Sequence, residues 1–384
     1  MIDRQLHVVV APDSFKGSLS AHEAAVAIEK GVHDVLPNAV VDKIPLSDGG
    51  EGLVKNTINA LGGSFRSIEV TGPDFEPVVA TYGFLDKQTA VMEMAQASGI
   101  ILSKWHDPSS TTTYGTGEMI RDAIKQGAKK IILGIGGSAT NDGGIGMAAA
   151  LGARFLDSHG KGVELSGSGL SSIESIDLSF YDKRISDIEI VVACDVTNPL
   201  YGENGAAYVY AAQKGANSEM IRRLDKGLRN YHRALQKSLG LDCANKEGAG
   251  AAGGLGAGLL AFTNATLRPG IEIVFELLDF DNKLAGVDLV ITGEGSIDAQ
   301  TLEGKVLLGV GRYTKKRGIP TIALCGQYKG DLSILNQEGI TSVFSINHEL
   351  IDEQLAIMKT AETVTLTTRQ IIRTVNALGV MQGE

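Results

Sequence analysis

Apolar residues at the start of the chain alternate between strand-like and helix-like spacing. A β-rich apolar run at His7–Ala11 ends abruptly at Pro12-Asp13. Ser20 and Glu23 then stand three residues apart, the spacing of an N-terminal capping box. The apolar helical face that follows consists of Ala25, Ile28, Val32 and Val35. With a second strand expected at Val40–Leu46 and a short helix after it, this alternation predicts a parallel sheet covered by helices.

The pattern changes near Ser64. Three β-like runs, RSIEV, PVVATYGFL and TAVMEMA, are separated by short polar connections, which is typical of an antiparallel meander. Further along, the spacing predicts helices at 116–126 and 218–239, strands at 130–133 and 188–193, and a segment rich in glycine and alanine at 248–262. The middle of the chain therefore predicts a mixed α/β region.

Strand and helix patterns of the parallel type return near the C-terminus, with buried strands expected at 287–292, 319–324 and 342–346. A chain of 384 residues exceeds what one hydrophobic core usually serves. The simplest assembly is one doubly wound α/β domain built from residues 1–64 and 286–384, with residues 65–285 inserted as a mixed α/β domain.

Composition narrows the class of protein. The apolar fraction is 43%, and the formal net charge of −10 with no basic run argues against a nucleic-acid partner. The three cysteines are far apart and predict buried thiols, without a disulfide framework or a metal site. No apolar stretch approaches the roughly 18 residues of a membrane span, and the N-terminus lacks a signal-peptide pattern. A cytoplasmic location is therefore expected.

Acidic residues follow five of the apolar strands. In open α/β sheets, ligands bind beyond the carboxyl ends of the strands. Carboxylates at that edge suit Mg²⁺, which prefers hard oxygen ligands and bridges to phosphates. The acids in these positions are Asp13, Asp48, Asp142, Asp195, Glu294 and Asp298. A single strand-end acid is often only the N-cap of the next helix, so the interpretation as a site depends on its recurrence.

Glycines accompany these acids, and their unpaired backbone N–H groups suit phosphate oxygens. Lys16 and Lys305 each lie in a glycine-bearing turn, in FKGS and EGKV, and Arg268 lies in TLRPG. Acid, glycine and an occasional cation are what phosphoryl transfer requires, because the protein must position the reacting groups and neutralise charge. No Walker-type phosphate loop occurs in the sequence.

Two alternatives stay open at this point. GIGGSA at 134–139, with Asp157 further on, partly matches a dinucleotide fingerprint and points to a nicotinamide-linked oxidoreductase of a small hydroxy acid. Against it, the run 140–144 (TNDGG) would break the helix that the fingerprint requires. The second alternative is a non-catalytic phosphate or nucleotide sensor, which has less need for acids at so many strand ends.

Long and unusual strings identify a resemblance to the bacterial type I glycerate kinases. They include APDSFKGSLSAHEAA, SDGGEG, GIGGSATNDGG, ACDVTNPLYGENGAA, GAGAAGGLGAG and TGEGSIDAQTLEGK, in this order over essentially the whole chain. The resemblance implies ATP-dependent phosphorylation of (R)-glycerate, in enteric-type members at the 2-hydroxyl. It also implies a Rossmann-like domain built from both chain ends, with a second domain inserted and the active-site cleft between the two.

Roles for single residues follow as hypotheses. Glu294 and Asp298 are expected to hold Mg²⁺ on the phosphate chain, and Asp195 to accept the hydroxyl proton of glycerate, with Asp48 able to exchange roles with it. Lys16, Lys305 and the amides of Gly136, Gly137 and Ser138 would offset developing charge. The other expected substrate or phosphate contacts are Asp13, Ser14, Gly49, Gly50, Glu51, Asn141, Asp142, Arg268, Gly293 and Gly295.

Overall fold

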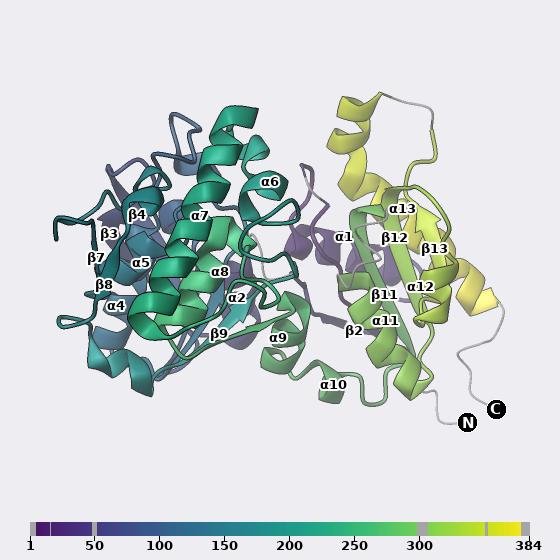
Figure 1. Ribbon diagram of the computed structural model, residues 1–384. Helices are drawn as coiled ribbons and strands as arrows, with labels where there is room; N and C mark the ends of the chain where they lie inside the picture. Colours follow the sequence, from purple (N-terminus) through teal and green to yellow (C-terminus); the bar gives the residue numbers. More distant parts are fainter. Residues whose placement is uncertain (1–4, 16, 48–51, 298–305, 350–351, 378–384) are drawn as a thin grey trace. The chain divides into compact units, whose positions relative to one another are not determined.

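The computed structural model describes residues 5–15, 17–47, 52–297, 306–349 and 352–377 (Figure 1). The chain divides into two compact units, one made of residues 1–48 and 271–384 and the other of residues 49–270. The predicted fold class is confirmed: an α/β unit built from both chain ends receives a mixed α/β unit as an insertion. The boundaries expected after residues 64 and 285, and the cleft expected between the domains, stay predictions.

The first unit is built on a five-stranded sheet in the order β13-β12-β11-β1-β2. All of its neighbouring strands are parallel, and β1 lies between β2 and β11, with Val10 beside both Lys43 and Ile291. The strands are β1 (His7–Val10), β2 (Val40–Lys43), β11 (Leu289–Ile297), β12 (Thr321–Tyr328) and β13 (Ser342–Ser345). A segment from the start of the chain is thus the neighbour of one some 280 residues later in the sequence.

Helices cover both faces of this sheet. α1 (Ala21–His33) and α13 (Glu353–Ala377) share one core with Ile322 and Leu324 of β12. The alternate residues of the same strand, Ala323 and Cys325, pack with side chains of α11 (Val306–Arg317) and α12 (Ser333–Gln337). Successive side chains of a strand point to opposite faces, so β12 is buried from both sides.

The first helix begins where the sequence predicts it. Ser20 caps α1: its hydroxyl accepts a hydrogen bond from the Glu23 N–H at 3.3 Å, and its own N–H donates to the Glu23 carboxylate at 2.8 Å. The predicted capping box is therefore confirmed, and the end of the β1–α1 connection is fixed by local chemistry.

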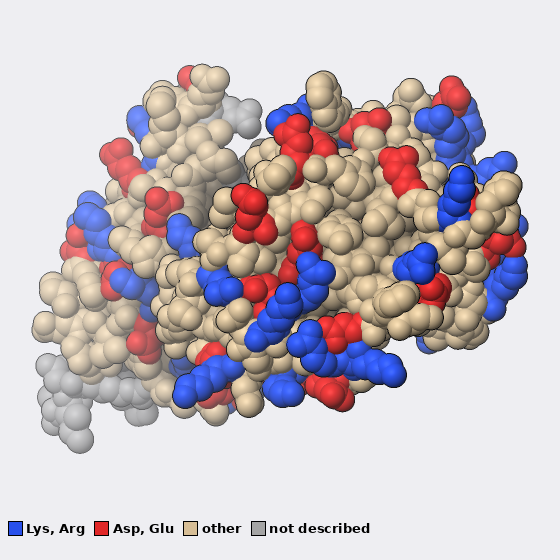
Figure 2. Space-filling model, turned by 90° about the vertical axis from the view of Figure 1, so that its left-hand side faces the viewer, with Lys and Arg blue, Asp and Glu red and all other residues tan. Residues whose placement is uncertain are grey.

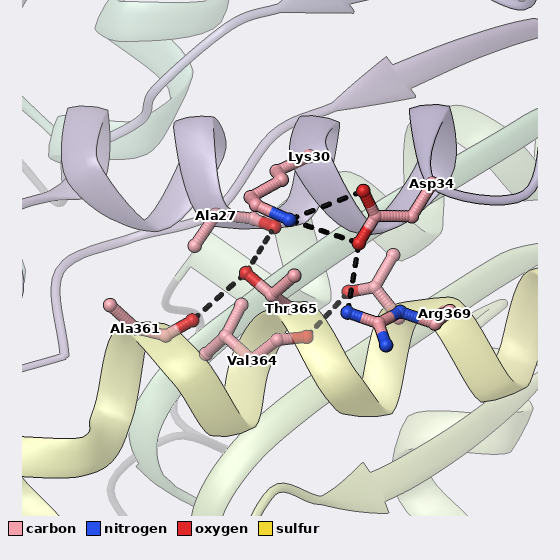
Figure 3. Close-up of polar contacts among 8 residues, drawn as sticks. Ala27, Lys30, Asp34, Ala361, Val364, Thr365 and Arg369 are labelled. Carbon is pink, nitrogen blue, oxygen red and sulfur yellow. Dashed lines mark hydrogen bonds and ion pairs between the residues drawn. The ribbon is translucent and has the colours of Figure 1, made fainter. Parts of the chain in front are cut away.

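α1 and α13 lie against each other over several turns, as Figure 3 shows. The Thr365 hydroxyl donates to the Ala27 carbonyl at 2.9 Å, and Asp34 accepts from Lys30 at 3.0 Å and from Arg369 at 2.8 Å. Gly31 permits this approach, because a Cβ atom built on it would lie 2.6 Å from Thr368 Cβ and 2.7 Å from the Thr365 carbonyl oxygen. The backbone carbonyl cannot move away without shifting a helix.

Substituting Gly31→Ala should therefore destabilise the first unit, although alanine normally favours helix formation. We expect the free energy of unfolding to fall by about 1–3 kcal/mol, the usual cost of overpacking a core. Denaturant unfolding measures this cost. Val26→Ala is the matched control, since Val26 lies on the exposed side of the same helix. A Gly31→Ala protein as stable as the wild type would mean that the helices separate at little cost.

The second unit contains a six-stranded mixed sheet in the order β10-β9-β6-β5-β4-β3. β3 and β4 form an antiparallel pair and β4 is antiparallel to β5, which confirms the predicted meander. β5, β6, β9 and β10 run parallel to one another. The strands are β3 (Ser64–Thr71), β4 (Pro77–Phe84), β5 (Thr89–Glu93), β6 (Lys130–Gly134), β9 (Glu189–Ala193) and β10 (Ala265–Arg268).

Two helical layers pack on this sheet. α4 (Tyr114–Lys125) and α8 (Ala251–Phe262) share a core with the strands. Beyond them, α7 (Ser218–Leu239) joins α6 (Ala206–Tyr210), α5 (Ile145–Ala150) and the strands β7 (Arg154–Leu156) and β8 (Ser175–Asp177) in a second core. The second unit also contains α2 (Leu53–Leu61) and α3 (Ala95–Ser98), whereas α9 (Gly270–Leu277) begins at the boundary and, with α10 (Phe280–Lys283), belongs to the first unit.

The glycine-rich start of α8 departs from a regular helix. Ala252, Gly253 and Gly254 all have left-handed backbone angles, with φ of 52°, 68° and 90°. The reason is tertiary: a Cβ atom on Gly253 would lie 2.0 Å from the carbonyl oxygen of Thr140. The turn thus lets the backbone of α8 press against the segment that follows β6.

The charges of the protein are mixed on the face that Figure 2 draws, where basic and acidic side chains are interspersed. No extended basic patch appears on that face, in keeping with the formal net charge of −10. Among the described helices, none has the length and apolarity that a membrane crossing requires.

Candidate functional site

The carboxyl ends of β1 and β11 lie side by side in the first unit. The Asp13 N–H donates to the Gly293 carbonyl at 2.8 Å, and the Thr292 hydroxyl donates to the Ala11 carbonyl at 2.7 Å. Ser14 folds back locally, since its N–H donates to the Asp13 carboxylate at 2.6 Å. These bonds bring the predicted site residues Asp13 and Ser14 next to the segment of β11 that carries Gly293, Glu294 and Gly295.

Glu294 is an almost buried carboxylate, 8% exposed. It lies beside Cys325 of the neighbouring strand β12. Burial, with the charge of Glu294 as a second cause, raises the pKa of the Cys325 thiol to about 12, so this cysteine stays a neutral thiol. Glu294 lies in the second half of β11, and a carboxylate held this far from water is suited to meet a cation.

Seven of the expected site residues lie outside the described residues: Lys16, Asp48, Gly49, Gly50, Glu51, Asp298 and Lys305. Their expected roles stay predictions. Among the residues that are described, no three His, Cys, Asp or Glu side chains are grouped so as to hold a metal ion. Glu294 with the neighbouring Asp13 nevertheless fits Mg²⁺, which often takes only one or two protein carboxylates and completes its shell with water and phosphate oxygens.

The second unit has a comparable edge. β5, β6, β9 and β10 are parallel, so their carboxyl ends meet at one side of the sheet. Asp195 follows β9, and Arg268 ends the adjoining β10. The Cys194 N–H donates to the Arg268 carbonyl at 2.9 Å, and the exposed Asp195 accepts a hydrogen bond from the Gly270 N–H at 2.8 Å. Two predicted site residues of opposite charge are thus neighbours at this edge.

The segment after β6 presents backbone at the same edge. Gly136 and Gly137 are exposed, and Gly137 has a left-handed φ of 71°. Their neighbours are fixed to the loop around α3: the Ile100 N–H donates to the Gly137 carbonyl at 2.8 Å, and the Ala139 N–H donates to the Ser98 carbonyl at 3.0 Å. Exposed glycine amides on a fixed loop can approach an anion closely.

Asn141 and Asp142, both expected to contact substrate or phosphate, are fully buried. The Asp142 carboxylate accepts hydrogen bonds from the Thr113 hydroxyl at 2.7 Å and from the N–H groups of Thr113, Gly144 and Gly146 at 2.8, 3.0 and 3.3 Å. Burial raises the pKa of Asp142, and these donors oppose that rise. In this geometry Asp142 fixes the start of α5 and the loop before α4.

Glu93 and Lys214 are buried charged residues of the second unit that were not predicted from the sequence. Glu93 ends β5 and accepts a hydrogen bond from the Val54 N–H at 2.8 Å, which holds the start of α2 directly after the SDGGEG string. Like the predicted acids, Glu93 stands at the end of an apolar strand, so the same sequence pattern could have identified it. Lys214 is 3% exposed and bonds to Ser138; a lysine between a glutamine and a glycine carries no signal of burial.

The partial dinucleotide fingerprint does not form its expected structure. After β6 the chain runs without a helix until α5 begins at Ile145. A dinucleotide fingerprint needs the helix to open within the glycines, so that its N-terminus meets the pyrophosphate. The interruption at 140–144 therefore removes the structural basis for a nicotinamide-linked oxidoreductase.

Comparisons with known proteins agree over almost the whole chain. The model of a family described as the glycerate kinase family matches residues 8–376. A glycerate 2-kinase of Escherichia coli K12 is 47% identical over 344 residues, which are 89% of this chain and 90% of that protein. A glycerate kinase of Halalkalibacterium halodurans is also 47% identical, over 88% of this chain and 90% of its own. The crystal structure of a putative glycerate kinase 2 from Salmonella typhimurium LT2 is 46% identical with a TM-score of 0.87, covering 97% of this chain and 99% of that one.

Proposed function

The chain belongs to the glycerate kinase family, and we propose that it transfers the γ-phosphoryl group of ATP to the 2-hydroxyl of (R)-glycerate, giving 2-phosphoglycerate. The observation that carries the choice of hydroxyl is the 47% identity to a protein named glycerate 2-kinase, over about nine-tenths of both chains. The carboxyl ends of the parallel strands in both sheets support the phosphoryl-transfer chemistry, since each region combines carboxylates with glycine backbone.

In the proposed reaction Asp195 accepts the proton of the 2-hydroxyl as the oxygen attacks the γ-phosphorus. The bond from that phosphorus to the bridging oxygen breaks, and ADP leaves with the electron pair. Asp195 suits this role because it is exposed and one of its oxygens already accepts a hydrogen bond, from the Gly270 N–H. Arg268 and the amides of Gly136, Gly137 and Ser138 would offset the charge of the phosphates or the substrate carboxylate.

Mg²⁺ would be held by Glu294 and Asp298, and Asp13 follows the strand next to the one that carries Glu294. When bound, such an ion bridges phosphate oxygens and neutralises their charge. The residues that are described contribute what this needs: Glu294 is an almost buried carboxylate, and Asp13 follows the neighbouring strand. The burial of Glu294 keeps competing water away from the interaction.

Replacing Glu294 with glutamine should raise the Mg²⁺ concentration that half-activates the enzyme and lower kcat by about 10²-fold, because a charge-stabilising group is lost. Asp298→Asn should have the same effect. Initial rates measured against Mg²⁺ at saturating ATP test this. Glu338→Gln, which loses only a surface ion pair to Arg312, is the matched control. If both site variants keep the wild-type Mg²⁺ dependence while folded, Glu294 and Asp298 do not hold the ion.

The activity itself is tested by following ADP release from Mg-ATP with and without glycerate. We expect release that depends strictly on (R)-glycerate, and no tight binding of NADH in a parallel titration. ADP release without glycerate would indicate a plain ATPase. Stoichiometric binding of ATP without turnover would favour a nucleotide sensor, and the proposed substrate would then be wrong.

A further inference from the structure

Lys214 is a lysine enclosed within the second unit. It ends a short 3₁₀ turn, Ala212–Lys214, between α6 and α7, and only 3% of its surface is exposed. Lysine is almost never buried to this degree unless its ammonium is paired. Here its Nζ donates to the Ser138 hydroxyl at 2.6 Å and to the Thr140 carbonyl at 2.7 Å.

These two bonds join distant parts of the sequence. Ser138 and Thr140 belong to the segment that follows β6 and exposes the amides of Gly136 and Gly137, whereas Lys214 belongs to the α6–α7 connection, more than 70 residues later. The other end of the same segment is held by Asp142, through Thr113 and the start of α5. Two buried charges of opposite sign therefore fix the segment, one on each side of Asn141.

We propose that Lys214 is a positioning residue for phosphoryl transfer. Its ammonium fixes the Ser138 hydroxyl and the Thr140 carbonyl, and thereby sets the direction in which the glycine amides meet an anionic oxygen of ATP or of the substrate. The proposal rests on the proposed function of that segment. Lys214 itself touches no reacting atom; it acts through the backbone it holds, and a misplacement of about 1 Å in such a segment can cost roughly 10²-fold in rate.

Protonation gives the proposal a readout of its own. Burial lowers the pKa of Lys214 from 10.5 to about 7, while the charge of Asp142 opposes this shift. Among the described residues, Tyr231 also lies near the Asp142 charge; burial raises the pKa of its hydroxyl well above 10. As the pH rises through about 7, Lys214 loses its proton and with it one of three donors. We therefore expect kcat/KM to fall across this range.

The lowered pKa of Lys214 also determines how the free energy of unfolding should change with pH. Below about pH 7 the folded and unfolded chains both carry the Lys214 proton, and between 7 and 10.5 only the unfolded chain does. The unfolded state then binds more protons, so this group makes the free energy of unfolding rise with pH in that window. Lys214→Met should abolish this contribution, which urea unfolding at a series of pH values measures without any substrate.

Lys214→Met should lower kcat/KM on the order of 10²-fold below neutral pH, mainly through kcat, and should remove the alkaline fall in the pH profile. Lys226→Met, at an exposed position on α7, is the matched control and should behave as the wild type. Wild-type kcat/KM within a few-fold in Lys214→Met, with the alkaline fall intact, would overturn the proposal.

A fluorescence titration tests the proposal if the variant does not fold. Trp105 is the single tryptophan of the chain and is 74% exposed. The carbonyl of the next residue, His106, packs against Gly215: a Cβ atom built on Gly215 would lie only 1.8 Å from it. The tryptophan is therefore close in sequence to a residue that contacts the end of the Lys214 turn. We expect the wild-type emission to change near pH 7 without substrates. No change in emission across this range would contradict the proposal.

The two proposals fail separately. If the protein releases no ADP with glycerate, the proposed function is wrong, but the fluorescence and unfolding titrations still report whether Lys214 fixes the segment. If ADP is released and the titrations are flat around neutral pH, the reaction stands and the positioning role of Lys214 does not.

Discussion

Replacing Asp195 with asparagine should lower kcat by about 10²- to 10⁴-fold, the usual range for loss of a general base. The substrate KM should change little, because asparagine has nearly the same shape and keeps an oxygen that accepts the Gly270 N–H. The variant should therefore fold normally, and the lost quantity is basicity. Steady-state kinetics at saturating ATP, with a thermal unfolding curve for each protein, measures both expectations.

Asp187→Asn is the matched control for this experiment. Asp187 is exposed and lies just before β9, at the opposite end of the strand that Asp195 follows. It should keep wild-type activity. If Asp195→Asn remains within about threefold of the wild type while Asp48→Asn is inactive, the base is Asp48, the alternative that the sequence left open.

Replacing Asp142 with alanine should lower the free energy of unfolding by about 3–5 kcal/mol, because several buried donors lose their acceptor at about 1–3 kcal/mol each. The change deprives four donors of their acceptor and leaves Lys214 buried without its nearby negative charge. Urea unfolding measures the loss. Asp157→Ala is the control, since Asp157 also accepts backbone N–H bonds, from His159 and Lys161, but in a surface turn; it should destabilise the protein far less than Asp142→Ala.

The double variant Asp142→Ala with Lys214→Met distinguishes two contributions of Asp142 to stability: its hydrogen bonds and its charge interaction with Lys214. If the two buried charges stabilise each other, the double variant should lose less free energy of unfolding than the sum of the two single variants, because it leaves no unpaired ammonium. Strict additivity would mean that Asp142 acts only through Thr113, Gly144 and Gly146.

The sequence predicted the elements whose signals are local. The capping box of Ser20 and Glu23 and the long amphipathic helix Ser218–Leu239 are both present where the pattern placed them. The sequence pattern did not predict β10, because Ala265–Arg268 is a short strand at the edge of the sheet and, among the described strands, pairs only with β9. The left-handed turn at Ala252–Gly254 was also beyond prediction, since its cause is the Thr140 backbone, more than 100 residues earlier.

For the candidate site, the sequence predicted which residues lie near the carboxyl ends of the strands. It did not predict which charged residues are buried behind them. Asp13 and Asp195 follow β1 and β9, Arg268 ends β10, and Glu294 lies in the second half of β11. Each pair lies toward the carboxyl ends of adjacent parallel strands of one sheet. Asp142 shares the same sequence pattern, yet it is buried and holds backbone. The packing of the folded chain distinguishes the buried Asp142 from the acids available to a ligand. It also shows that Lys214 is buried beside Ser138.

Proton-coupled ³¹P NMR of the product from Mg-ATP and (R)-glycerate tests the central claim most directly. Phosphorus on the 2-hydroxyl is three bonds from one proton, and phosphorus on the 3-hydroxyl is three bonds from two. We therefore predict a new phosphomonoester doublet that grows together with ADP. A triplet would place the phosphoryl group on the 3-hydroxyl and contradict the assignment of 2-phosphoglycerate, and no new signal from folded protein would contradict the proposed kinase reaction itself.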